Sequence, residues 1–305
     1  MQKIAAIDIG TNTALLLVAE VTQGNEIIPI VQEEWIVRLG QGVDRKKNLS
    51  SEAIARTLAA IQEQIEIVRD LGVEQILISG TSAVRDAVNR EILLDAIKND
   101  FGITLQVLSG DEEAKLTYFG ALSNQNLPGD ILVVDIGGGS TELIFGTQQK
   151  IEYATSLNIG SVRLTERFIG TDPITDAEYN SIRHAIKEQL TSLKHFDAEQ
   201  LVGIAGTITT LAAMQLQMDI YDSLTIDNSL ITISKVEKII SVLKKKTLSQ
   251  RKKMPGLKPK RADVILAGAL ILVEVMQHLK FTEIFVSDRG VRFGLILQEL
   301  GMINV

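Results

Sequence analysis

The sequence predicts an α/β protein built from two duplicated halves, and three observations support this fold class. The chain has 305 residues, which is enough for about two domains of ordinary size. Short β-type runs alternate with amphipathic helical stretches, a pattern typical of α/β folds. Segments of the first half also have counterparts, in the same order, in the second half.

The clearest repeated segment is a short apolar strand that ends in an aspartate and is followed by a glycine turn and a second strand. It occurs once around Asp8 and Gly10, and again around Asp135 and Gly137. The other matched pairs are Ile78–Thr81 with Ile204–Thr207, and Val107–Gly110 with Phe285–Asp288. Three matches in one order indicate a duplication, with a long insertion before the last strand of the second half.

Each half is expected to contain two hairpin strands and a third strand, followed by alternating helices and strands. In the first half the third strand lies near Glu26–Val37, and a helix over Ser51–Leu71 has a serine cap and ends before Gly72. Further strands are expected over Gln75–Ser79 and Thr104–Leu108, and further helices over Arg90–Asn99, Glu178–Leu193, Lys235–Leu243 and Val264–Leu279. The turn at 127–129 separates an N-terminal domain, residues 1–124, from a C-terminal domain, residues 125–305, whose last helix can pack back on the first domain.

Composition excludes several kinds of site. The chain has no cysteine, which rules out disulfides, thiolate metal sites and cysteine nucleophiles, and its three histidines are far apart in sequence. The first apolar run contains Asp8 and has no basic leader, so it does not resemble a signal peptide. The longest apolar stretch, Ile265–Met276, is too short for a membrane span and contains Glu274. We therefore expect a cytoplasmic protein without a membrane partner.

The two glycine turns are candidate phosphate sites. Successive backbone N–H groups in such a turn form a concave site for an anion, and glycine allows a ligand to approach the main chain closely. Asp8 and Asp135, at the strand ends, could hold a metal ion directly or through water. A single turn of this kind is more simply explained as a hairpin, but two equivalent turns favour phosphate binding. Neither turn has the pattern of a Walker loop or of a dinucleotide fingerprint.

These segments resemble those of a known family. Asp8–Asn12 and Asp135–Glu142 are similar to the two phosphate loops of the actin, sugar kinase and heat-shock chaperone ATPase superfamily. Val37–Gly42, Ser109–Ala114 and Arg261–Asp263 narrow the resemblance to the exopolyphosphatase and guanosine pentaphosphate phosphatase family, in its short two-domain form. The resemblance covers essentially the whole chain. It implies two duplicated RNase H-like (actin-like) domains, each with a mixed sheet, and a cleft between them.

The resemblance also implies roles for the carboxylates. Glu113 would be the general base that activates water, and Glu142 a second catalytic carboxylate that holds the water or a metal ion. Asp8, Asp135 and Glu142 would bind Mg²⁺, with Mn²⁺ as an alternative. Glu112 and Glu113 also begin a predicted helix, where acidic residues are favourable for structural reasons alone.

Phosphate contacts are expected from both turns and from two arginines. The turn residues are Gly10, Thr11, Asn12, Thr13, Gly137, Gly138, Gly139 and Ser140. Arg85 and Arg38 could bind phosphate bidentately, and a surface salt bridge is the alternative for each. Arg289 and Arg292 follow the last strand, where the superfamily binds its nucleotide or phosphate tail, but Phe293 departs from the family's pattern.

A basic segment suggests a rail, by which we mean a row of positive side chains along which a polyanion could bind. The net charge of the chain is −7, yet the segment from Lys244 to Arg261 contains nine lysines and arginines and no acidic residue. The expected rail residues are Lys252, Lys253, Lys258, Lys260 and Arg261. Because the segment has no aromatic residue for base stacking, nucleic acid is a poor candidate ligand. A solvated basic face is the alternative explanation.

The leading functional hypothesis is an exopolyphosphatase that releases orthophosphate from the end of inorganic polyphosphate. The alternative is removal of the terminal 5′-phosphate of guanosine pentaphosphate, which the same resemblance allows. A nucleotide-dependent kinase is a weaker hypothesis, because no adenine pocket or substrate base is evident. A non-enzymatic nucleotide sensor or filament-forming actin relative is another, and it predicts binding without turnover. Homodimerisation is left open.

Overall fold

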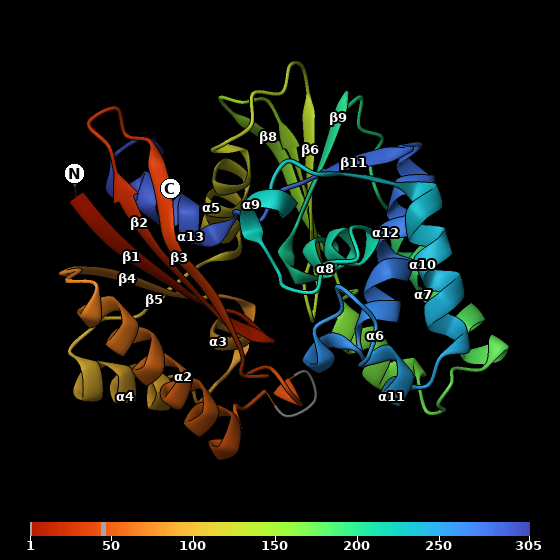
Figure 1. The fold of residues 1–305 in the computed structure, drawn as a ribbon, viewed down its shortest axis with the longest axis horizontal. Coiled ribbons are helices and arrows are strands. Elements are labelled where there is room, and N and C mark those ends of the chain that lie inside the picture. The colour runs from red at the N-terminus through yellow and green to blue at the C-terminus, as the bar shows by residue number, and fades with distance from the viewer. Residues whose placement is uncertain (1, 44–46) are drawn as a thin grey trace. The chain divides into compact units, whose positions relative to one another are not determined.

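The computed structural model describes residues 2–43 and 47–305 (Figure 1). The chain divides into two compact units, Met1–Ser123 with Gly290–Val305, and Asn124–Arg289. Each unit contains a mixed sheet with helices, which is the α/β class that the sequence predicts. The sequence-based boundaries place Gly290–Val305 in the C-terminal domain, with the last helix able to pack back on the first domain. In the structure this segment is part of the first unit.

The first unit is built on a mixed sheet with the strand order β3-β2-β1-β4-β5. Its strands are β1 (Gln2–Ile9), β2 (Thr13–Val21), β3 (Ile27–Ile36), β4 (Gln75–Gly80) and β5 (Gln106–Val107). β1, β2 and β3 form an antiparallel meander, whereas β1, β4 and β5 run parallel to one another. Because parallel strands end at the same edge of a sheet, the segments that follow β1, β4 and β5 meet at one edge. This edge carries the predicted site residues of the first unit.

Helices cover both faces of this sheet. α2 (Ser51–Asp70), α3 (Ser82–Asp86) and α4 (Glu91–Phe101) share one apolar core with it, and α5 (Gly110–Leu122) and α13 (Val291–Glu299) share another. α2 is capped by the side chain of Ser50, which accepts a hydrogen bond from the N–H of Ala53. α3 was not expected from the sequence, and β5 is shorter than the run that predicted it.

α5 and α13 approach each other closely through glycines. A Cβ on Gly120 would lie 2.1 Å from the carbonyl oxygen of Gly290. A Cβ on Gly294 would lie 2.2 Å from the carbonyl oxygen of Leu116. The C-terminal helix therefore packs backbone to backbone against α5 within the first unit.

The second unit repeats the architecture of the first, with an additional edge strand. Its sheet has the order β10-β11-β9-β6-β7-β8. The strands are β6 (Ile131–Ile136), β7 (Thr141–Gly146), β8 (Ile151–Leu157), β9 (Gln200–Ile204), β10 (Leu230–Thr232) and β11 (Glu283–Val286). β8, β7, β6, β9 and β11 take the places of β3, β2, β1, β4 and β5, as a duplication requires. β10 pairs antiparallel with β11 and comes from the inserted segment.

The helices of the second unit include the longest apolar stretch of the chain. They are α6 (Ser161–Phe168), α7 (Asp176–Leu190), α8 (Ala205–Gln215), α9 (Ser223–Ile226), α10 (Ile233–Lys245), α11 (Leu248–Arg251), the 3₁₀ helix η1 (Pro259–Arg261) and α12 (Ile265–Leu279). α12 is buried over most of its length, and its buried Glu274 forms ion pairs with Arg183 and Lys187. In the described part of the chain, no helix has the length and apolar character needed to cross a bilayer.

Candidate active site

The first glycine turn is held by the segment that follows β3. The N–H of Gly10 donates to the carbonyl of Thr13 at 2.8 Å, which closes the turn. The carbonyl of Thr11 accepts from the N–H of Gly40 at 2.8 Å, and the carbonyl of Asn12 accepts from the N–H of Arg38 at 2.9 Å. Arg38 therefore supports the turn through its backbone, and it has a positive φ of 50°. Arg38, the predicted phosphate ligand, therefore lies next to the first turn and is hydrogen-bonded to it.

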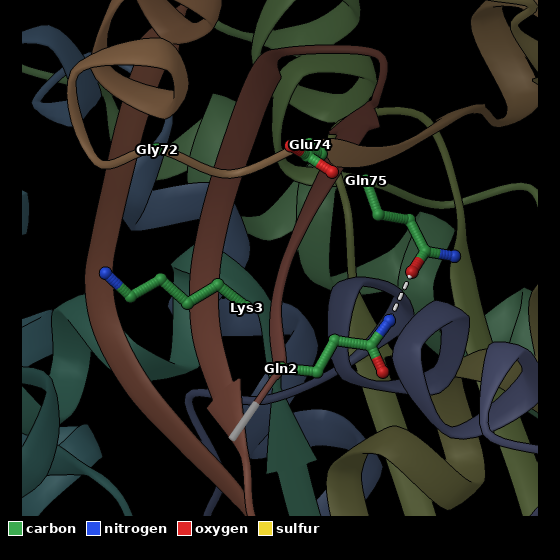
Figure 2. A pocket seen from close by; sticks show the side chains of 5 residues that line it. All are labelled: Gln2, Lys3, Gly72, Glu74 and Gln75. Carbon is green, nitrogen blue, oxygen red and sulfur yellow. Dashed lines mark hydrogen bonds between the residues drawn. The ribbon is translucent and has the colours of Figure 1, made fainter.

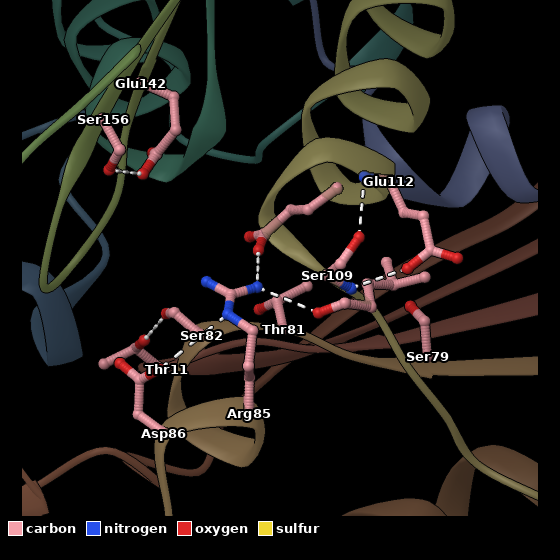
Figure 3. A network of polar contacts seen from close by, with 12 residues as sticks. Thr11, Ser79, Thr81, Ser82, Arg85, Asp86, Ser109, Glu112, Glu142 and Ser156 are labelled. Carbon is pink, nitrogen blue, oxygen red and sulfur yellow. Dashed lines mark hydrogen bonds and ion pairs between the residues drawn. The ribbon is translucent and has the colours of Figure 1, made fainter. Parts of the chain in front are cut away.

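Side chains add two further contacts to this turn. The hydroxyls of Thr11 and Ser82 lie 2.9 Å apart, so the start of α3 contacts the turn (Figure 3). A Cβ on Gly40 would lie 2.3 Å from Cγ2 of Thr11. Only glycine fits at position 40 without moving the turn, which explains Gly40 in the Val37–Gly42 motif.

The second glycine turn is held by the N-terminus of α6. The N–H of Gly137 donates to the carbonyl of Ser140 at 3.0 Å, the same closure as in the first turn. The carbonyl of Gly137 accepts from the N–H of Ser161 at 2.9 Å, and the carbonyl of Gly138 accepts from the N–H of Arg163 at 3.0 Å. In addition, Nε of Arg163 donates to the carbonyl of Gly139 at 2.6 Å.

These contacts determine where the turn N–H groups point. In a planar trans peptide, the carbonyl of one residue and the N–H of the next point in opposite directions. Because the turn carbonyls of Gly137 to Gly139 face α6, the following N–H groups face away from it. Within residues 2–43 and 47–305, no hydrogen bond uses the N–H of Gly138, Gly139 or Ser140. Such a row of outward N–H groups is a suitable anion site.

Asp8, the predicted metal ligand of the first unit, is buried beside a serine. Oγ of Ser79 donates to Oδ1 of Asp8 at 3.1 Å. Burial raises the pKa of Asp8 to about 6, although the hydrogen bond from Ser79 and the positive charge of Arg292 act in the opposite direction. Burial is therefore the dominant influence on the pKa of Asp8.

Asp135 and Glu142, the predicted metal ligands of the second unit, are direct cross-strand partners on β6 and β7. Side chains at opposed antiparallel positions lie on the same face of the sheet, with Cβ atoms about 5 Å apart. Oγ of Ser156, on β8, donates to Oε1 of Glu142 at 2.7 Å. In the first unit the corresponding partner of Asp8 is Leu15, so the carboxylate pair is a property of the second unit only.

This carboxylate pair fits Mg²⁺. Among the described residues, no group of three histidine, cysteine, aspartate or glutamate side chains forms a metal cluster. Mg²⁺ does not need one, because it usually keeps several waters and binds one or two carboxylates together with substrate phosphates. Two opposed carboxylates are therefore an adequate protein contribution to such a site.

Arg85 and Glu113, predicted as a phosphate ligand and a general base, form an ion pair. Nη1 of Arg85 lies 2.6 Å from Oε2 of Glu113 and also donates to the carbonyl of Leu108 at 3.0 Å. The two side chains are 30% and 21% exposed, so the pair is only partly shielded from water. Nε of Arg85 lies 3.8 Å from Oδ1 of Asp86 (Figure 3). The structure thus joins two residues that the sequence treats separately.

Glu112 has a different role from its neighbour. Its carboxylate accepts a hydrogen bond from the N–H of Ser109 at 2.7 Å, and Oγ of Ser109 accepts from the N–H of Glu112 at 3.2 Å (Figure 3). This reciprocal capping box fixes the start of α5. The hydrogen bonds from Ser109 lower the pKa of Glu112. Of the two adjacent glutamates, one therefore caps the helix and the other reaches Arg85.

The arginines after β11 are engaged in structural contacts. Arg292 is buried, and its Nη1 donates to the carbonyl of Leu16 at 2.9 Å. Nε of Arg289 lies 3.2 Å from Oδ2 of Asp227, which also accepts from Nδ2 of Asn124 at 3.2 Å. The sequence indicates a phosphate-tail site for these arginines but neither of these two contacts.

The basic segment does not form one continuous face. Arg251 is buried and donates to the carbonyl of Leu243, and Lys244 pairs with Asp176 at 2.7 Å. Of the predicted rail residues, Lys252, Lys253 and Lys260 are exposed, and Nζ of Lys258 lies 4.7 Å from the ring centroid of Tyr221. The guanidinium of Arg261 lies against Gly206, where a Cβ would approach its Nη1 to 2.1 Å. Gly206 therefore makes room for an arginine, which is a structural reason for this glycine.

A surface pocket of the first unit lies away from these residues. It is lined by Gln2, Lys3, Gly72, Glu74 and Gln75, at the beginning of β1 and β4 (Figure 2). The glycine turn follows the other end of β1, so this pocket contains none of the predicted site residues. We therefore base the functional argument on the turns and their polar contacts.

Arg163 is the site residue that the sequence analysis missed. It lies on α6, outside all the motifs that suggested the family, and contacts the second turn through both its backbone and its side chain. The available signal was the Gly160–Arg163 segment, a glycine followed three residues later by an arginine, close after β8. That pattern is too common to single out without the structure.

Two duplicated mixed sheets, each with a strand, a glycine turn and a second strand, are typical of the actin-like fold. The candidate residues of each unit suit a phosphate-handling enzyme of this fold. Residues 17–302 match the Ppx/GppA phosphatase family, and the chain belongs to this family. Its class is that of the phosphoanhydride hydrolases. The resemblance on which the sequence analysis relied is therefore confirmed.

Individual relatives agree with this assignment. The chain is 35% identical over 318 residues to Exopolyphosphatase 2 of Mycobacterium tuberculosis, with 99% of each chain covered. It is also 38% identical over 307 residues to a bifunctional 3-dehydroquinate synthase/phosphatase of Fusobacterium nucleatum. That alignment covers 96% of this chain but only 46% of the length of the relative.

Solved structures show the same fold. An exopolyphosphatase from Cytophaga hutchinsonii superposes with a TM-score of 0.91 at 28% identity, covering 99% of both chains. The Ppx/GppA family member of Aquifex aeolicus gives a TM-score of 0.85 at 29% identity, covering 100% of this chain and 99% of that one. The predicted fold class is confirmed by these similarities.

Proposed function

We propose that this protein is an exopolyphosphatase that hydrolyses the terminal phosphoanhydride bond of inorganic polyphosphate and releases orthophosphate. Family membership and the similarity to Exopolyphosphatase 2 of Mycobacterium tuberculosis support this substrate. The observation that carries the proposal is the ion pair between Arg85 and Glu113, because it links a phosphate-binding group to a proton acceptor.

Glu113 is the proposed general base. Its carboxylate lies 2.6 Å from Nη1 of Arg85, and this contact fixes where the proton acceptor lies. The second residue of the pair, Arg85, also donates to the carbonyl of Leu108, so the guanidinium is fixed from two sides. This arrangement orients the carboxylate of Glu113 without placing it in the apolar core.

Arg85 can contact a phosphate while it holds Glu113. The hydrogen bonds to Glu113 and to the carbonyl of Leu108 both use Nη1, and within the described residues no hydrogen bond or ion pair uses Nη2. Guanidinium presents several donors in one plane, so one nitrogen can bind the carboxylate while the other binds a phosphate oxygen. The pair would then hold the attacking water and the terminal phosphate at a fixed separation.

The proposed ligands of Mg²⁺ are the opposed carboxylates of β6 and β7. Asp135 and Glu142, both in the second unit, would hold the ion, with Ser156 orienting Glu142. Asp8 is a separate candidate carboxylate for a metal ion in the first unit. When bound, Mg²⁺ neutralises charge on the phosphate oxygens. Each glycine turn, within its own unit, would bind phosphate oxygens through its backbone N–H groups.

The proposed polyphosphate rail has fewer residues than the sequence predicts. Lys252, Lys253 and Lys260 are exposed on the segment 252–261, which follows α11 and includes η1, and would attract the chain by charge. Arg261 and Lys258 belong to the same segment, but their contacts with Gly206 and Tyr221 give them structural tasks as well.

The test compares Glu113→Gln with Glu112→Gln. Release of orthophosphate from polyphosphate is measured with Mg²⁺, and binding of polyphosphate is measured separately. We expect Glu113→Gln to lose turnover by about 100-fold or more while it still binds polyphosphate, as removal of a general base should do. Glu112→Gln is the matched control, because glutamine can keep the capping box. Normal turnover in Glu113→Gln would refute the base assignment.

The same assay distinguishes the other functions. Guanosine pentaphosphate, presented beside polyphosphates of several lengths, tests the alternative substrate suggested by the family resemblance. A higher kcat/KM for guanosine pentaphosphate would replace polyphosphate as the proposed substrate. Binding without phosphate release from either substrate would support a sensor instead.

A further inference from the structure

We propose that Arg163 is a positioning residue that aims the N–H groups of the second glycine turn at a phosphate. The inference rests on the proposed function, because it takes this turn to be a phosphate site. Arg163 lies on α6, and the turn is Gly137–Ser140, between β6 and β7. Both elements belong to the second unit, so the argument depends only on contacts within that unit.

Arg163 contacts the turn at two consecutive peptides. Its backbone N–H donates to the carbonyl of Gly138 at 3.0 Å, and its Nε donates to the carbonyl of Gly139 at 2.6 Å. The side-chain contact is short, as expected for a hydrogen bond from a charged donor. The carbonyl of Gly139 has no other hydrogen bond within the described residues, so its orientation depends on the Arg163 side chain.

The orientation of that carbonyl determines the orientation of one N–H. The peptide that joins Gly139 to Ser140 is planar, so its carbonyl and the N–H of Ser140 point in opposite directions. While Arg163 holds the carbonyl, the N–H of Ser140 points away from α6. If the carbonyl were released, this glycine-rich peptide could rotate easily, since glycine is permissive at either sign of φ. The outward donor would then be lost for part of the time.

The rest of the turn has backbone support. The carbonyls of Gly137 and Gly138 accept hydrogen bonds from the first N–H groups of α6, and Gly160 lets the helix approach so closely. A Cβ on Gly160 would lie 2.3 Å from the carbonyl oxygen of Gly138. The helix therefore fixes the first part of the turn, and the side chain of Arg163 fixes the last part.

The first turn achieves the same result without a side chain. There the carbonyls of Thr11 and Asn12 accept hydrogen bonds from the backbone of Gly40 and Arg38. The two halves of the duplication thus use different means to orient equivalent turns. This difference makes Arg163 a specific requirement of the second turn.

The test uses Arg163→Ala, Arg163→Lys and, as matched control, Arg167→Ala. Arg167 is an exposed arginine on the same helix, with its guanidinium over the ring of Phe168, and in the described part of the chain it makes no hydrogen bond to the turn. Two quantities are measured for each variant: the affinity for orthophosphate by calorimetry, and kcat and KM for phosphate release from polyphosphate. Thermal unfolding of each variant shows whether the fold is retained.

We expect Arg163→Ala to weaken orthophosphate binding and to lower kcat/KM by about 10- to 100-fold, the usual effect of losing a charged hydrogen bond. Arg163→Lys should recover much of both, because an ammonium can still donate to the carbonyl of Gly139. Arg167→Ala should behave like the wild type. A merely structural role would lower the unfolding temperature of Arg163→Ala without changing the affinity for orthophosphate of the folded protein.

Three results would overturn the proposal. They are wild-type orthophosphate affinity and kcat/KM in Arg163→Ala, equal losses in Arg163→Lys and Arg163→Ala, and an equal loss in Arg167→Ala. If Arg163→Ala does not fold, the comparison of Arg163→Lys with Arg163→Gln takes its place, and the charged variant should bind orthophosphate more tightly. Failure of the wild type to hydrolyse polyphosphate would refute the proposed function instead, while the orthophosphate measurement would still test Arg163.

Discussion

Nη1 of Arg85 and Oε2 of Glu113 lie 2.6 Å apart, so a residue after β4 is paired with a residue on α5 at one edge of the first sheet. Each residue alone has a simple structural explanation, a surface salt bridge or a helix-terminal acid. Together they form an oriented carboxylate beside a guanidinium that still has donors to offer. The following predictions test this pair and the elements around it.

Substitution of Arg85 should impair catalysis more than it impairs the fold. Arg85→Ala removes both the proposed phosphate contact and the partner of Glu113, and we expect kcat/KM to fall by about 100-fold or more. Arg85→Lys keeps the charge but cannot hold a carboxylate and a phosphate with one planar group, so it should recover little. Steady-state kinetics with polyphosphate measure both effects. Arg69→Ala, an exposed change on α2, is the control, and wild-type kinetics in Arg85→Ala would contradict the assignment.

Asp8 should make the free energy of unfolding depend on pH. Its pKa is raised from 3.8 to about 6 by burial, so the folded state binds this proton more tightly than the unfolded state. The contribution of Asp8 to stability is therefore fully present below pH 4 and is lost as the pH rises through about 6, by at most about 3 kcal/mol.

Urea unfolding in the absence of divalent ions tests this pH dependence. Asp8→Asn removes the titration, so its stability relative to the wild type should increase between pH 4.5 and 7.5. Asp70→Asn, at an exposed position, should show no such trend. A constant difference between Asp8→Asn and the wild type over this pH range would show that Asp8 has an ordinary pKa.

Gly40→Ala should disturb the first glycine turn through one methyl group. The new Cβ would lie 2.3 Å from Cγ2 of Thr11, and we expect a loss of about 1–3 kcal/mol in stability together with reduced activity. Thr11→Ser removes that methyl group, so the double variant should be more stable than the sum of the single changes predicts. Gly24→Ala, whose Cβ would meet nothing closer than 3.8 Å, is the control. Strict additivity in chemical denaturation would exclude the proposed clash.

Arg289 should contribute to stability rather than to substrate binding. Its pair with Asp227 is about nine-tenths buried, and removal of one partner of such a pair typically costs about 3–5 kcal/mol. Arg289→Ala should therefore lower the midpoint of denaturant unfolding while the KM for polyphosphate stays unchanged below that midpoint. A large increase in KM with unchanged stability would restore the phosphate role that the sequence suggested.

The exposed lysines of the rail should matter for long substrates only. Reversing both charges in a Lys252→Glu, Lys253→Glu variant should lower kcat/KM for long polyphosphate several-fold at low salt, and the difference should shrink as salt is added. Tripolyphosphate should be hydrolysed as by the wild type, because it is too short to need a rail. Lys98→Glu, an exposed charge reversal on α4, is the control for one such reversal elsewhere on the surface and is compared with Lys252→Glu alone. Equal effects on long and short substrates would count against a rail.

Much of the fold could be predicted because its signals are local or repeated. The strand, glycine turn and strand around Asp8 and around Asp135 recur in sequence, and in the structure β1 with β2 and β6 with β7 form equivalent hairpins. The apolar period of the helix after Ser50 likewise predicts α2 closely. The ends of short strands are less predictable. The sequence predicts a strand over Thr104–Leu108, but β5 contains only Gln106–Val107, the two residues that pair with β4.

The site was predictable as a set of residues but not as a set of contacts. Motifs indicated Arg85, Glu113 and the glycine turns, yet the basic segment looked continuous although Arg251 is buried beneath it. Burial depends on how a segment packs against distant elements, here on the carbonyl of Leu243, and charge counts contain no such information.

From the chain's order of residues alone follow its α/β class, its duplication, its family and the two turns that could bind phosphate, because these depend on short-range spacing and on repetition. The pairing of Arg85 with Glu113, the support of the Gly139 carbonyl by Arg163, and the bond from Arg292 to Leu16, 276 residues away, follow only from the folded chain. A hydrogen bond requires two groups within about 3 Å in a suitable direction. For groups on different elements, that distance and direction are set by the packing of the whole unit.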